Sequence, residues 1–339
     1  MLAGYTGNEP LAAHTTLKVG GAATYFAIAN SEAKLRGLLA TANEAGEPVT
    51  MLGGGSNVLV ADTGIPGCVI KNAITGWQAA EDNGQVHLTV GAGEVFDAVV
   101  EKTVAAGWWG LENLSHIPGS VGATPIQNVG AYGTEVADCI VSVTAIHRDT
   151  LESRTFTNTE CQFGYRDSWF KSEAGRAWVI TGVTFALSAT PKPNLSYRDL
   201  TERFSGSTPT VEEVRAAVIA IRSQKFPDWH TVGTAGSFFK NPIISQTHFA
   251  KLQARYPELP GFPTDSGGVK VPLGWILDKV CHLRGVSDGP VGTYQGQALV
   301  LVNTGDASAT NVTRFAKKIV AAVHAATDIT IDWEVTLLG

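Results

Sequence analysis

The chain has 339 residues, of which 44% are hydrophobic and 17% charged, and its formal net charge is −6. This length predicts two or three domains with well-filled cores, and the acidic balance excludes a nucleic acid or an anionic membrane as the main partner. The first residues lack a basic segment followed by an apolar core, and no later apolar run is long enough to cross a membrane. We therefore expect a soluble protein of the cytoplasm.

Cysteine and histidine lack the spacing of metal ligands. The four cysteines, Cys68, Cys139, Cys161 and Cys281, lie far apart with no C-x-x-C pair, and the eight histidines are scattered. We predict reduced, buried thiols and no metal site. We also expect His116 to serve in packing or hydrogen bonding rather than as a ligand.

Helices and strands are predicted in mixed order along the first part of the chain. Ser31 is a typical N-cap of a helix that runs to about Gly46, and strands flank this helix on both sides. The next predicted elements are a strand at 85–90, a helix at 94–106, and strands at 139–147 and 178–187. They indicate a small α/β unit over about the first 75 residues and a second unit after it.

The clearest helix prediction covers residues 210–225. Thr210 and Glu213 form a capping box, and four apolar side chains share one face: Val211, Val214, Val218 and Ile221. We expect this helix to bridge two domains. Beyond it the sequence predicts helices at 272–283 and 308–326, a strand at 298–303, and a final strand at 329–338.

Side chains of the predicted final strand, ITIDWEVTLL, alternate in polarity. Its apolar members share one face: Ile329, Ile331, Trp333, Val335 and Leu337. Glu334 lies on the other face. The pattern alone favours a solvated face, and a carboxylate directed into a cleft between domains is the functional alternative.

A glycine turn joins two apolar runs near residue 55. The sequence VTMLGGGSNVLV places three glycines, Gly53, Gly54 and Gly55, before Ser56 and Asn57. Three glycines between buried strands leave a turn whose N–H groups can point outward together and hold a phosphate without cationic side chains. An ordinary tight turn in a glycine-rich protein explains this pattern equally well.

A longer glycine-rich run extends from Ile117 to Gly133. Its sequence, IPGSVGATPIQNVGAYG, carries four glycines, two prolines and no charge. A surface linker normally carries charged side chains, so we expect this backbone to pack closely against something other than water. Together the two segments predict a diphosphate site. Neither matches the G-x-G-x-x-G dinucleotide fingerprint or the P-loop, which needs a lysine after its last glycine.

Ser237, in GTAGSFFKNP, is a candidate for proton transfer. Small residues precede it and Phe238 and Phe239 follow it, so we expect its hydroxyl to be exposed on one side and bordered by a dry wall on the other. The G-x-S-x-G spacing of a serine hydrolase is absent. A buried serine bonded to its own backbone is the alternative.

Three cationic side chains are candidates for anion binding. Arg166, in FGYRDSWF, has a planar fork that suits a carboxylate, although pairing with Asp167 or stacking on Trp169 explains its place as well. Arg222 and Lys225 lie near the end of the predicted bridging helix, on a stripe apart from its apolar face. Such a pair is either solvated or placed to bind a sugar diphosphate.

These segments together resemble one family, the UDP-N-acetylenolpyruvoylglucosamine reductases, also called UDP-N-acetylmuramate dehydrogenases. The chain contains, in the family's order and spacing, the motifs GGGSNVLV, GLENLSHIPGSVGATPIQNVGAYG, GYRDSWF, RSQKFPD, AGSFFKNP, GWILDKV, GQALVLVN and the late WEV. The resemblance runs from about Leu17 to Leu337. The segment PKPNLSYRDL resembles the additional tyrosine loop of the larger subclass.

The resemblance implies an α+β protein. It has a two-subdomain FAD-binding fold of the p-cresol methylhydroxylase/vanillyl-alcohol oxidase type plus a C-terminal α+β substrate domain. We therefore expect FAD-binding subdomains at 1–75 and 76–222 and a substrate-binding domain at 223–328, with residues 329–339 returning to the first subdomain.

The resemblance also implies an activity. The family uses NADPH and non-covalently bound FAD to reduce the enolpyruvyl group of UDP-N-acetylglucosamine enolpyruvate to UDP-N-acetylmuramate, a precursor of peptidoglycan. NADPH and the UDP-sugar are expected to use one cleft in turn. We expect a monomer that binds these small molecules and neither nucleic acid nor membrane.

Particular residues match functional positions of the family. Ser237 resembles the general acid that protonates the substrate after hydride addition, and Arg166 and Glu334 resemble the pair that binds and polarises the enolpyruvyl carboxylate. The implied FAD contacts are Gly53, Gly54, Gly55, Ser56, Asn57, Ile117, Pro118, Gly119, Ser120, Gly122, Ala123, Ile126, Gly130 and Ile180. The implied substrate contacts are Tyr165, Tyr197, Arg222, Lys225, Asn241 and Gln297. Among them, Tyr197 belongs to the loop that folds over the substrate diphosphate.

Two parts of the chain are not explained by the resemblance to this family. The segment from Phe262 to Lys270, FPTDSGGVK, does not align with the family, so its substrate contacts stay open. Trp108 and Trp109 match no family role, and we expect them to be ordinary core residues.

Two other functions remain as alternatives. Another FAD oxidoreductase or oxidase of the same fold also needs both glycine-rich segments, but it gives no reason for AGSFFKNP together with a late glutamate. A nucleotide-sugar binding protein without catalysis is the second alternative. The presence of Ser237, Arg166 and Glu334 weighs against it.

Overall fold

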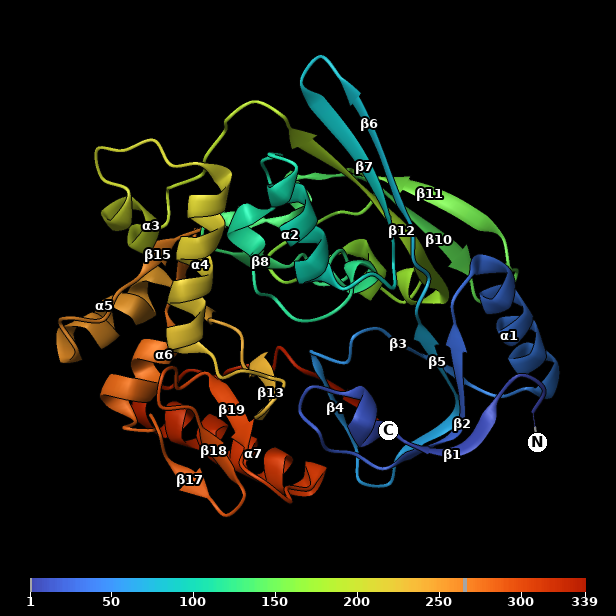
Figure 1. The fold of residues 1–339 in the computed structure, drawn as a ribbon. Helices are drawn as coiled ribbons and strands as arrows, with labels where there is room; N and C mark the ends of the chain where they lie inside the picture. The colour runs from blue at the N-terminus through green and yellow to red at the C-terminus, as the bar shows by residue number, and fades with distance from the viewer. Residues whose placement is uncertain (1, 265–266) are drawn as a thin grey trace. The chain divides into compact units, whose positions relative to one another are not determined.

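A computed structural model describes residues 2–264 and 267–339. The chain divides into two compact units, each made of separate segments (Figure 1). The first unit comprises Met1–Glu9, Ala23–Gly55 and Ile65–Ser223, and the second comprises Pro10–Ala22, Ser56–Gly64 and Gln224–Gly339. Residues 10–22 and 56–64, which the sequence prediction included in the first FAD subdomain, thus belong to the second unit.

The first unit contains a small, largely parallel sheet with the strand order β1-β2-β5-β3. Its strands are β1 (Thr6–Pro10), β2 (Ala22–Ala29), β5 (Ile65–Asn72) and β3 (Val49–Leu52), of which β2, β5 and β3 run parallel. Helix α1 (Glu32–Ala45) confirms the prediction. The Ser31 side chain accepts a hydrogen bond from the Lys34 N–H (3.2 Å), and Gly46 ends the helix in the left-handed conformation, at φ 68°.

A five-stranded antiparallel sheet forms the rest of this unit's framework, with the order β11-β10-β12-β7-β6. Its strands are β6 (Trp77–Asp82), β7 (Gln85–Gly91), β10 (Ile140–His147), β11 (Ser153–Thr157) and β12 (Trp178–Ser188). The predicted strands at 85–90, 139–147 and 178–187 are confirmed. The predictions contained no edge strand β6, because all six of its residues are exposed and no alternation marks it.

Helix α2 (Phe96–Ala105) confirms the helix predicted at 94–106 and packs its apolar side into the core of this sheet. Trp109 is 4% exposed and belongs to that core, as predicted. Trp108 lies at its rim, where its ring stacks on Trp77 with centroids 6.4 Å apart, and Lys102 Nζ lies 5.5 Å from the centroid of the Trp77 ring. Trp108 is therefore only partly buried.

Short elements carry the long connections of the first unit. They are η2 (Glu112–Leu114), η3 (Val121–Ala123), β8 (Gly130–Ala131), β9 (Thr134–Glu135), η4 (Val136–Asp138), η5 (Trp169–Lys171), η6 (Gly175–Ala177) and α3 (Arg198–Arg203). Most of the uncharged run at 117–133 is thus irregular backbone, which fits its many glycines and prolines.

Helix α4 (Val211–Lys225) carries the chain from the first unit into the second, as the predicted bridging helix does. Its predicted capping box is confirmed, because the Thr210 N–H donates to Glu213 Oε2 (2.8 Å) and the Glu213 N–H donates to Thr210 Oγ1 (3.3 Å). Val211, Val214 and Val218 are buried on its apolar face.

Removing the capping hydroxyl is expected to destabilise the protein. Thr210→Ala should lower the free energy of unfolding by about 1 kcal/mol, because the Glu213 N–H loses its acceptor. Thr210→Ser keeps the hydroxyl and should lose much less. Chemical denaturation of the three proteins measures the difference, and equal losses for alanine and serine would contradict the capping role.

The described residues of the second unit form three small sheets. The largest has the order β13-β19-β18-β17, formed by β13 (Gly233–Ser237), β19 (Val300–Asn303), β18 (Val291–Thr293) and β17 (Ser287–Asp288). A three-stranded sheet contains β14 (Ile243–Ile244), β16 (Val269–Lys270) and β15 (Phe262–Pro263), and a parallel pair contains β4 (Val58–Val60) and β20 (Thr336–Leu338). Within the unaligned segment 262–270, residues 265–266 lie outside the described residues.

Helices of the second unit are η1 (Leu11–His14), α5 (Gln246–Arg255), α6 (Leu273–Trp275), η7 (Ile276–Val280) and α7 (Ala309–Thr327). The helix predicted at 308–326 is confirmed by α7, whose N-cap Ser308 accepts a hydrogen bond from the Asn311 N–H (3.1 Å). Phe315, Ile319 and Val323 of α7 are buried in the core of this unit.

Two predictions for the second unit are wrong in part. The helix predicted at 272–283 is α-helical only over α6 and continues as the π-helical turn η7. The strand predicted at 329–338 is regular only over β20. Leu337 is 51% exposed, because β20 forms a sheet only with the three-residue strand β4. Ile329, Ile331 and Val335 are buried as predicted.

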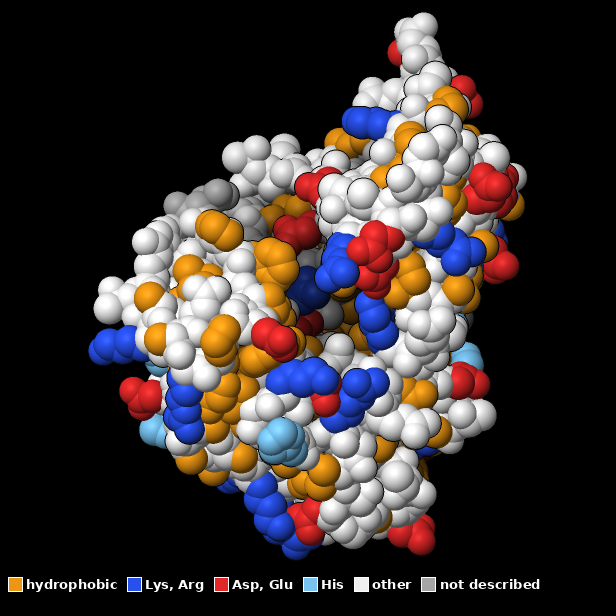
Figure 2. Space-filling view, turned by 90° about the vertical axis from the view of Figure 1, so that its left-hand side faces the viewer, with side chains coloured by type: hydrophobic (Ala, Val, Ile, Leu, Met, Phe, Trp, Pro, Cys, Tyr) orange, Lys and Arg blue, Asp and Glu red, His pale blue; other side chains and the backbone are white. Residues whose placement is uncertain are grey.

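One face of the molecule carries mixed charge (Figure 2), and the cysteine thiols are free. Figure 2 shows acidic and basic side chains interspersed over the face that it displays. No helix within residues 2–264 and 267–339 is long and apolar enough to span a membrane. All four cysteines are free thiols, but the prediction of burial is wrong for Cys281, which is only half-buried.

Candidate functional site

The two predicted glycine segments meet in the first unit. A β-carbon built on Gly54 would lie 2.7 Å from the Cα of Gly119, and one built on Gly53 would lie 2.5 Å from Ser120 Oγ. A side chain on Gly54 would collide with the backbone of the other segment, so this approach requires glycine at that position, whereas one on Gly53 would displace only the Ser120 hydroxyl. Segments that are distant in the sequence thus form one surface.

The first turn also has uncommitted hydrogen-bond donors. Within the part of the chain that the structure describes, the N–H groups of Gly53, Gly54 and Gly55 take part in no hydrogen bond. Three consecutive amides without acceptors, in a segment that carries no charged side chain, fit an anion such as the diphosphate of FAD.

The other residues predicted to contact FAD in the first unit have varied surroundings. Gly122 is buried, and a β-carbon there would lie 2.6 Å from that of Ala92, so close packing explains this glycine. Ile180 is 5% exposed, and its carbonyl accepts a hydrogen bond from Asn72 Nδ2 (2.8 Å), whereas Ile126 is 39% exposed. Half-buried positions are Ile117, Pro118, Gly119, Ala123 and Gly130.

Ser56 and Asn57, the last residues of the GGGSN turn, belong to the second unit. Asn57 Nδ2 donates to the Glu334 carbonyl (3.1 Å), and the Asn57 carbonyl accepts a hydrogen bond from the Thr336 N–H (3.0 Å). The end of the glycine turn is therefore tied to the segment that carries Glu334.

Arg166 lies beside the end of the uncharged run. Its Nη2 donates to the Gly130 carbonyl (2.8 Å), and its guanidinium carbon lies 5.5 Å from the centroid of the Tyr165 ring. Its φ is 54°, a left-handed conformation that is uncommon for residues other than glycine and is concentrated at functional sites. The structure thus groups Arg166 with Tyr165 and Gly130.

A β-bulge sets the position of Ser237 at the end of β13. The register of β13 against β19 shifts between Thr234 and Ser237, and Gly236 inside this bulge has φ 72°. Such a bulge redirects the side chain that follows it. Ser237 is half-buried, and the predicted aromatic wall is confirmed because Phe238 and Phe239 are 0% and 1% exposed.

The structure places Ser237 and Glu334 on adjacent segments of the second unit. The Phe238 carbonyl accepts a hydrogen bond from the Glu334 N–H (2.8 Å), and the Phe238 and Trp333 rings have centroids 5.0 Å apart. Because Ser237 directly precedes Phe238, backbone bonds fix the two residues relative to each other.

Two predicted substrate residues of the second unit each lie beside the start of α6. Asn241 Oδ1 accepts a hydrogen bond from the Leu273 N–H (2.9 Å), and a β-carbon on Gly274 would lie 2.6 Å from Gln297 Oε1. A third, Lys225, is half-buried at the end of α4.

Tyr197 and Arg222 lie in the first unit. Tyr197 is 38% exposed, and its ring meets the Tyr132 ring edge-on with centroids 5.0 Å apart. Arg222 is 8% exposed, and its Nε donates to the His116 carbonyl (3.0 Å). The prediction that Arg222 lies on a stripe apart from the buried face of the helix is therefore wrong. Burial lowers the pKa of its guanidinium and raises the pKa of Tyr132 to about 12.

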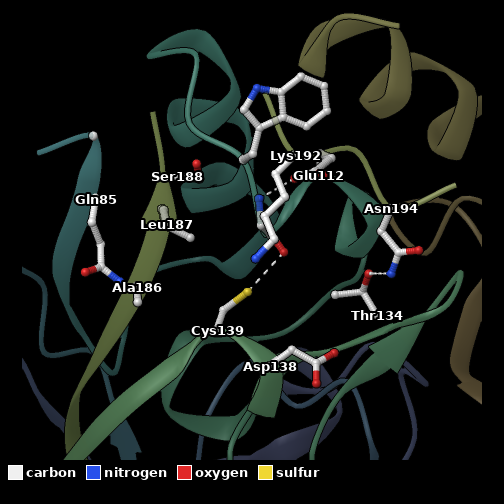
Figure 3. Close-up of a pocket in the computed structure, with 13 residues that line it drawn as sticks. Gln85, Glu112, Thr134, Asp138, Cys139, Ala186, Leu187, Ser188, Lys192 and Asn194 are labelled. Carbon is white, nitrogen blue, oxygen red and sulfur yellow. Dashed lines mark hydrogen bonds between the residues drawn. The ribbon is translucent and has the colours of Figure 1, made fainter. Parts of the chain in front are cut away.

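A cavity of about 400 Å³ in the first unit contains none of the predicted site residues (Figure 3). Glu112 on its wall is 2% exposed, accepts a hydrogen bond from the Gly110 N–H (2.6 Å), and has its pKa raised by burial. Cys139 Sγ donates to the Gly110 carbonyl (3.2 Å), and burial raises the pKa of this thiol to about 12. Burial thus favours the protonated thiol, which is a poor nucleophile.

An ion pair that was not predicted from the sequence lies beside the uncharged run. Arg215 Nη1 lies 2.7 Å from Asp97 Oδ1, and the two side chains are 12% and 21% exposed. The sequence shows only an aspartate in the first turn of α2 and an arginine within α4. Neither position indicates which residue its side chain contacts. In the described residues, no cluster of three or more His, Cys, Asp or Glu side chains is arranged to hold a metal ion.

Two family models match separate parts of the chain. Residues 23–151 match an FAD binding domain, and residues 227–338 match the C-terminal domain of UDP-N-acetylenolpyruvoylglucosamine reductase. The first range contains the meeting glycine segments, and the second contains Ser237 and Glu334.

Whole-chain relatives agree with these matches. The UDP-N-acetylenolpyruvoylglucosamine reductase of Chromobacterium violaceum is 41% identical over 90% of this chain and 91% of its own length, and that of Ralstonia nicotianae is 40% identical over 96% of both. A crystal structure of UDP-N-acetylenolpyruvylglucosamine reductase from Thermus caldophilus covers 97% of both chains with a TM-score of 0.67 and 24% identity.

The predicted fold class is confirmed by these comparisons. The chain combines an FAD binding domain with the C-terminal α+β domain of the reductase family, and its fold is similar to that of the Thermus caldophilus enzyme. Its identity to the Chromobacterium and Ralstonia enzymes extends over nearly the whole length of each protein. The chain belongs to the UDP-N-acetylenolpyruvoylglucosamine reductase family.

Proposed function

We propose that this protein reduces the enolpyruvyl group of UDP-N-acetylglucosamine enolpyruvate to UDP-N-acetylmuramate, with NADPH as reductant and non-covalently bound FAD as hydride carrier. The observation that carries the proposal is the backbone pairing of the Ser237 and Glu334 segments through Phe238, in a chain that has an FAD binding domain. An oxidase of the same fold requires the glycine segments but not this arrangement of a hydroxyl and a carboxyl group.

Ser237 is the proposed proton donor. Hydride addition to one carbon of the double bond leaves negative charge on the other carbon and on the adjacent carboxylate, and a proton on that second carbon completes the reduction. The half-buried hydroxyl next to the buried Phe238 and Phe239 supports this role, because a dry wall strengthens hydrogen bonding to a developing charge.

Arg166 and Glu334 are the proposed carboxylate-binding pair. Negative charge on the substrate carboxylate grows as the enol-like intermediate forms, so a guanidinium fork and a hydrogen-bonding carboxyl group stabilise this state more than the ground state. The hydrogen bond from Arg166 to the Gly130 carbonyl supports a fixed orientation of the guanidinium. The hydrogen bond from the Glu334 N–H to the Phe238 carbonyl supports a fixed position of the segment that carries Glu334.

The proposed substrate contacts are Tyr165, Tyr197, Lys225, Asn241 and Gln297. Their support is the half-buried or exposed position of each side chain and the position of Asn241 and Gln297 beside the start of α6. Arg222 is nearly buried, so we propose that it supports the site through its bond to His116.

The proposed FAD contacts are the residues predicted from the sequence in segments 53–57 and 117–130, together with Ile180. The close approach of Gly54 to Gly119 and the uncommitted amides of the first turn support the diphosphate assignment. We further propose a monomer that acts in the cytoplasm on small molecules. We also propose that it binds no nucleic acid, and the net charge of −6 supports this second proposal.

An anaerobic experiment with two half-reactions tests the function. NADPH is expected to bleach the flavin of the purified protein, and addition of UDP-N-acetylglucosamine enolpyruvate is expected to restore its absorbance with formation of UDP-N-acetylmuramate. A flavin that stays reduced after this addition would contradict the reductase assignment. Reoxidation by oxygen alone would support an oxidase, and binding of the UDP-sugar without turnover would support a binding protein.

A further inference from the structure

His116, the residue before the uncharged run, is held through both groups of its backbone. Its N–H donates to Asp97 Oδ1 (2.6 Å), and its carbonyl accepts a hydrogen bond from Arg222 Nε (3.0 Å). Its φ is 60°, so a non-glycine residue adopts the left-handed conformation at this point. Such a conformation persists only where surrounding contacts hold it.

Backbone hydrogen bonds align the start of the run along the segment that leads into α2. The Phe96 N–H donates to the Gly119 carbonyl (3.0 Å), the Val121 N–H donates to the Glu94 carbonyl (2.9 Å), and the Gly122 N–H donates to the Ala92 carbonyl (2.8 Å). The Asp97 side chain continues this series to His116. It therefore ties His116 to the same segment.

Arg215 fixes the Asp97 carboxylate. Its Nη1 donates to Oδ1 (2.7 Å) and its Nη2 donates to Oδ2 (3.3 Å). Burial opposes ionisation of Asp97, but hydrogen bonds from Arg215 and from the His116 N–H outweigh it and lower the pKa of the carboxyl group. An ionised carboxylate is a stronger acceptor for the His116 N–H than a neutral group.

We propose that Asp97 is a positioning residue for FAD. By accepting the His116 N–H, it fixes the entry of the backbone that meets the 53–55 turn, and Arg215 orients it from α4. A binding surface that is already ordered loses less conformational entropy when its ligand binds, so this anchor strengthens FAD binding without touching FAD. The inference rests on the proposed FAD contacts of the run.

A matched pair of variants at Asp97 tests the anchor. Asp97→Asn and Asp97→Leu have similar side-chain volumes, and both remove the charge paired with Arg215, but only asparagine keeps an oxygen that can accept the His116 N–H. Titration of each apoprotein with FAD, followed by flavin fluorescence, is expected to give a dissociation constant about tenfold higher for leucine than for asparagine. Thermal unfolding of the same apoproteins reports stability separately.

A variant of a solvent-exposed ion pair provides the control. Arg154 and Glu160 lie 2.7 Å apart in the same unit, with side chains 49% and 42% exposed. Glu160→Gln breaks this pair and is expected to leave the FAD dissociation constant unchanged. A loss of FAD affinity in this variant equal to that in Asp97→Leu would show that any lost ion pair has the effect, and it would overturn the inference.

Equal FAD dissociation constants for Asp97→Asn and Asp97→Leu would also overturn the positioning role. If the leucine variant does not fold, Arg222→Gln and Arg222→Met test the same anchor from the carbonyl side. Only glutamine keeps an N–H group that can donate to the His116 carbonyl. Equal FAD dissociation constants for these two variants would likewise overturn the positioning role. Failure of the unchanged protein to bind FAD would instead contradict the proposed function, and this inference with it.

Discussion

Replacing Ser237 with alanine is expected to leave the reduction of flavin by NADPH nearly unchanged and to slow flavin reoxidation by the enolpyruvyl substrate by about 10²–10⁴-fold. The change removes the proposed proton donor while the β13 bulge and the Phe238 bond to Glu334 involve only backbone and neighbouring residues. Rapid mixing without oxygen measures the two half-reactions separately, so the rate of each is obtained from one protein preparation.

The control removes another serine hydroxyl from the same unit. Ser245 is the N-cap of α5, and its Oγ accepts a hydrogen bond from the His248 N–H (3.1 Å). Ser245→Ala should leave both half-reactions at the rate of the unchanged protein. If Ser237→Ala slows both half-reactions equally, the hydroxyl serves structure or flavin binding and is not the proton donor.

Replacing Gly54 with alanine is expected to raise the FAD dissociation constant by about tenfold or more. The added methyl group would lie 2.7 Å from the Cα of Gly119, so the two glycine segments must move apart, and overpacking of this kind costs about 1–3 kcal/mol. The flavin content of the purified protein and an FAD titration of the apoprotein both measure the effect.

Gly37 provides a matched glycine-to-alanine control. It lies in α1 of the same unit, and a β-carbon there meets no atom within 4 Å. Gly37→Ala should therefore retain FAD with unchanged affinity. An unchanged FAD dissociation constant in Gly54→Ala would mean that the two segments separate without cost or that FAD binds elsewhere.

Local patterns in the sequence predicted much of the secondary structure. The caps of α1 and α4 and the alternation of β7 depend on residues a few positions apart, and the structure confirms them. Elements without such a pattern were missed, as the fully exposed strand β6 shows. The final strand was predicted too long because its alternation begins at residue 329, whereas β4 pairs only with residues 336–338.

Candidate residues were also predictable, but their partners were not. The sequence singled out Arg222 as a cation near a helix end, whereas the structure buries it against the His116 carbonyl. Asp97 and Arg215 were not singled out, because their ion pair joins α2 to α4 across 118 positions of sequence. An aspartate in the first turn of a helix is common, and its spacing alone does not reveal the residue that it contacts.

The sequence by itself determined the family, the FAD-binding and C-terminal domains, and the chemical types available to the site: glycine backbone, a hydroxyl, a guanidinium and a carboxylate. Only the tertiary structure decided that Gly54 meets Gly119, that Phe238 joins the Ser237 and Glu334 segments, and that Asp97 anchors His116. The physical reason is that capping and periodicity act between residues near in sequence, whereas these contacts depend on how distant segments pack.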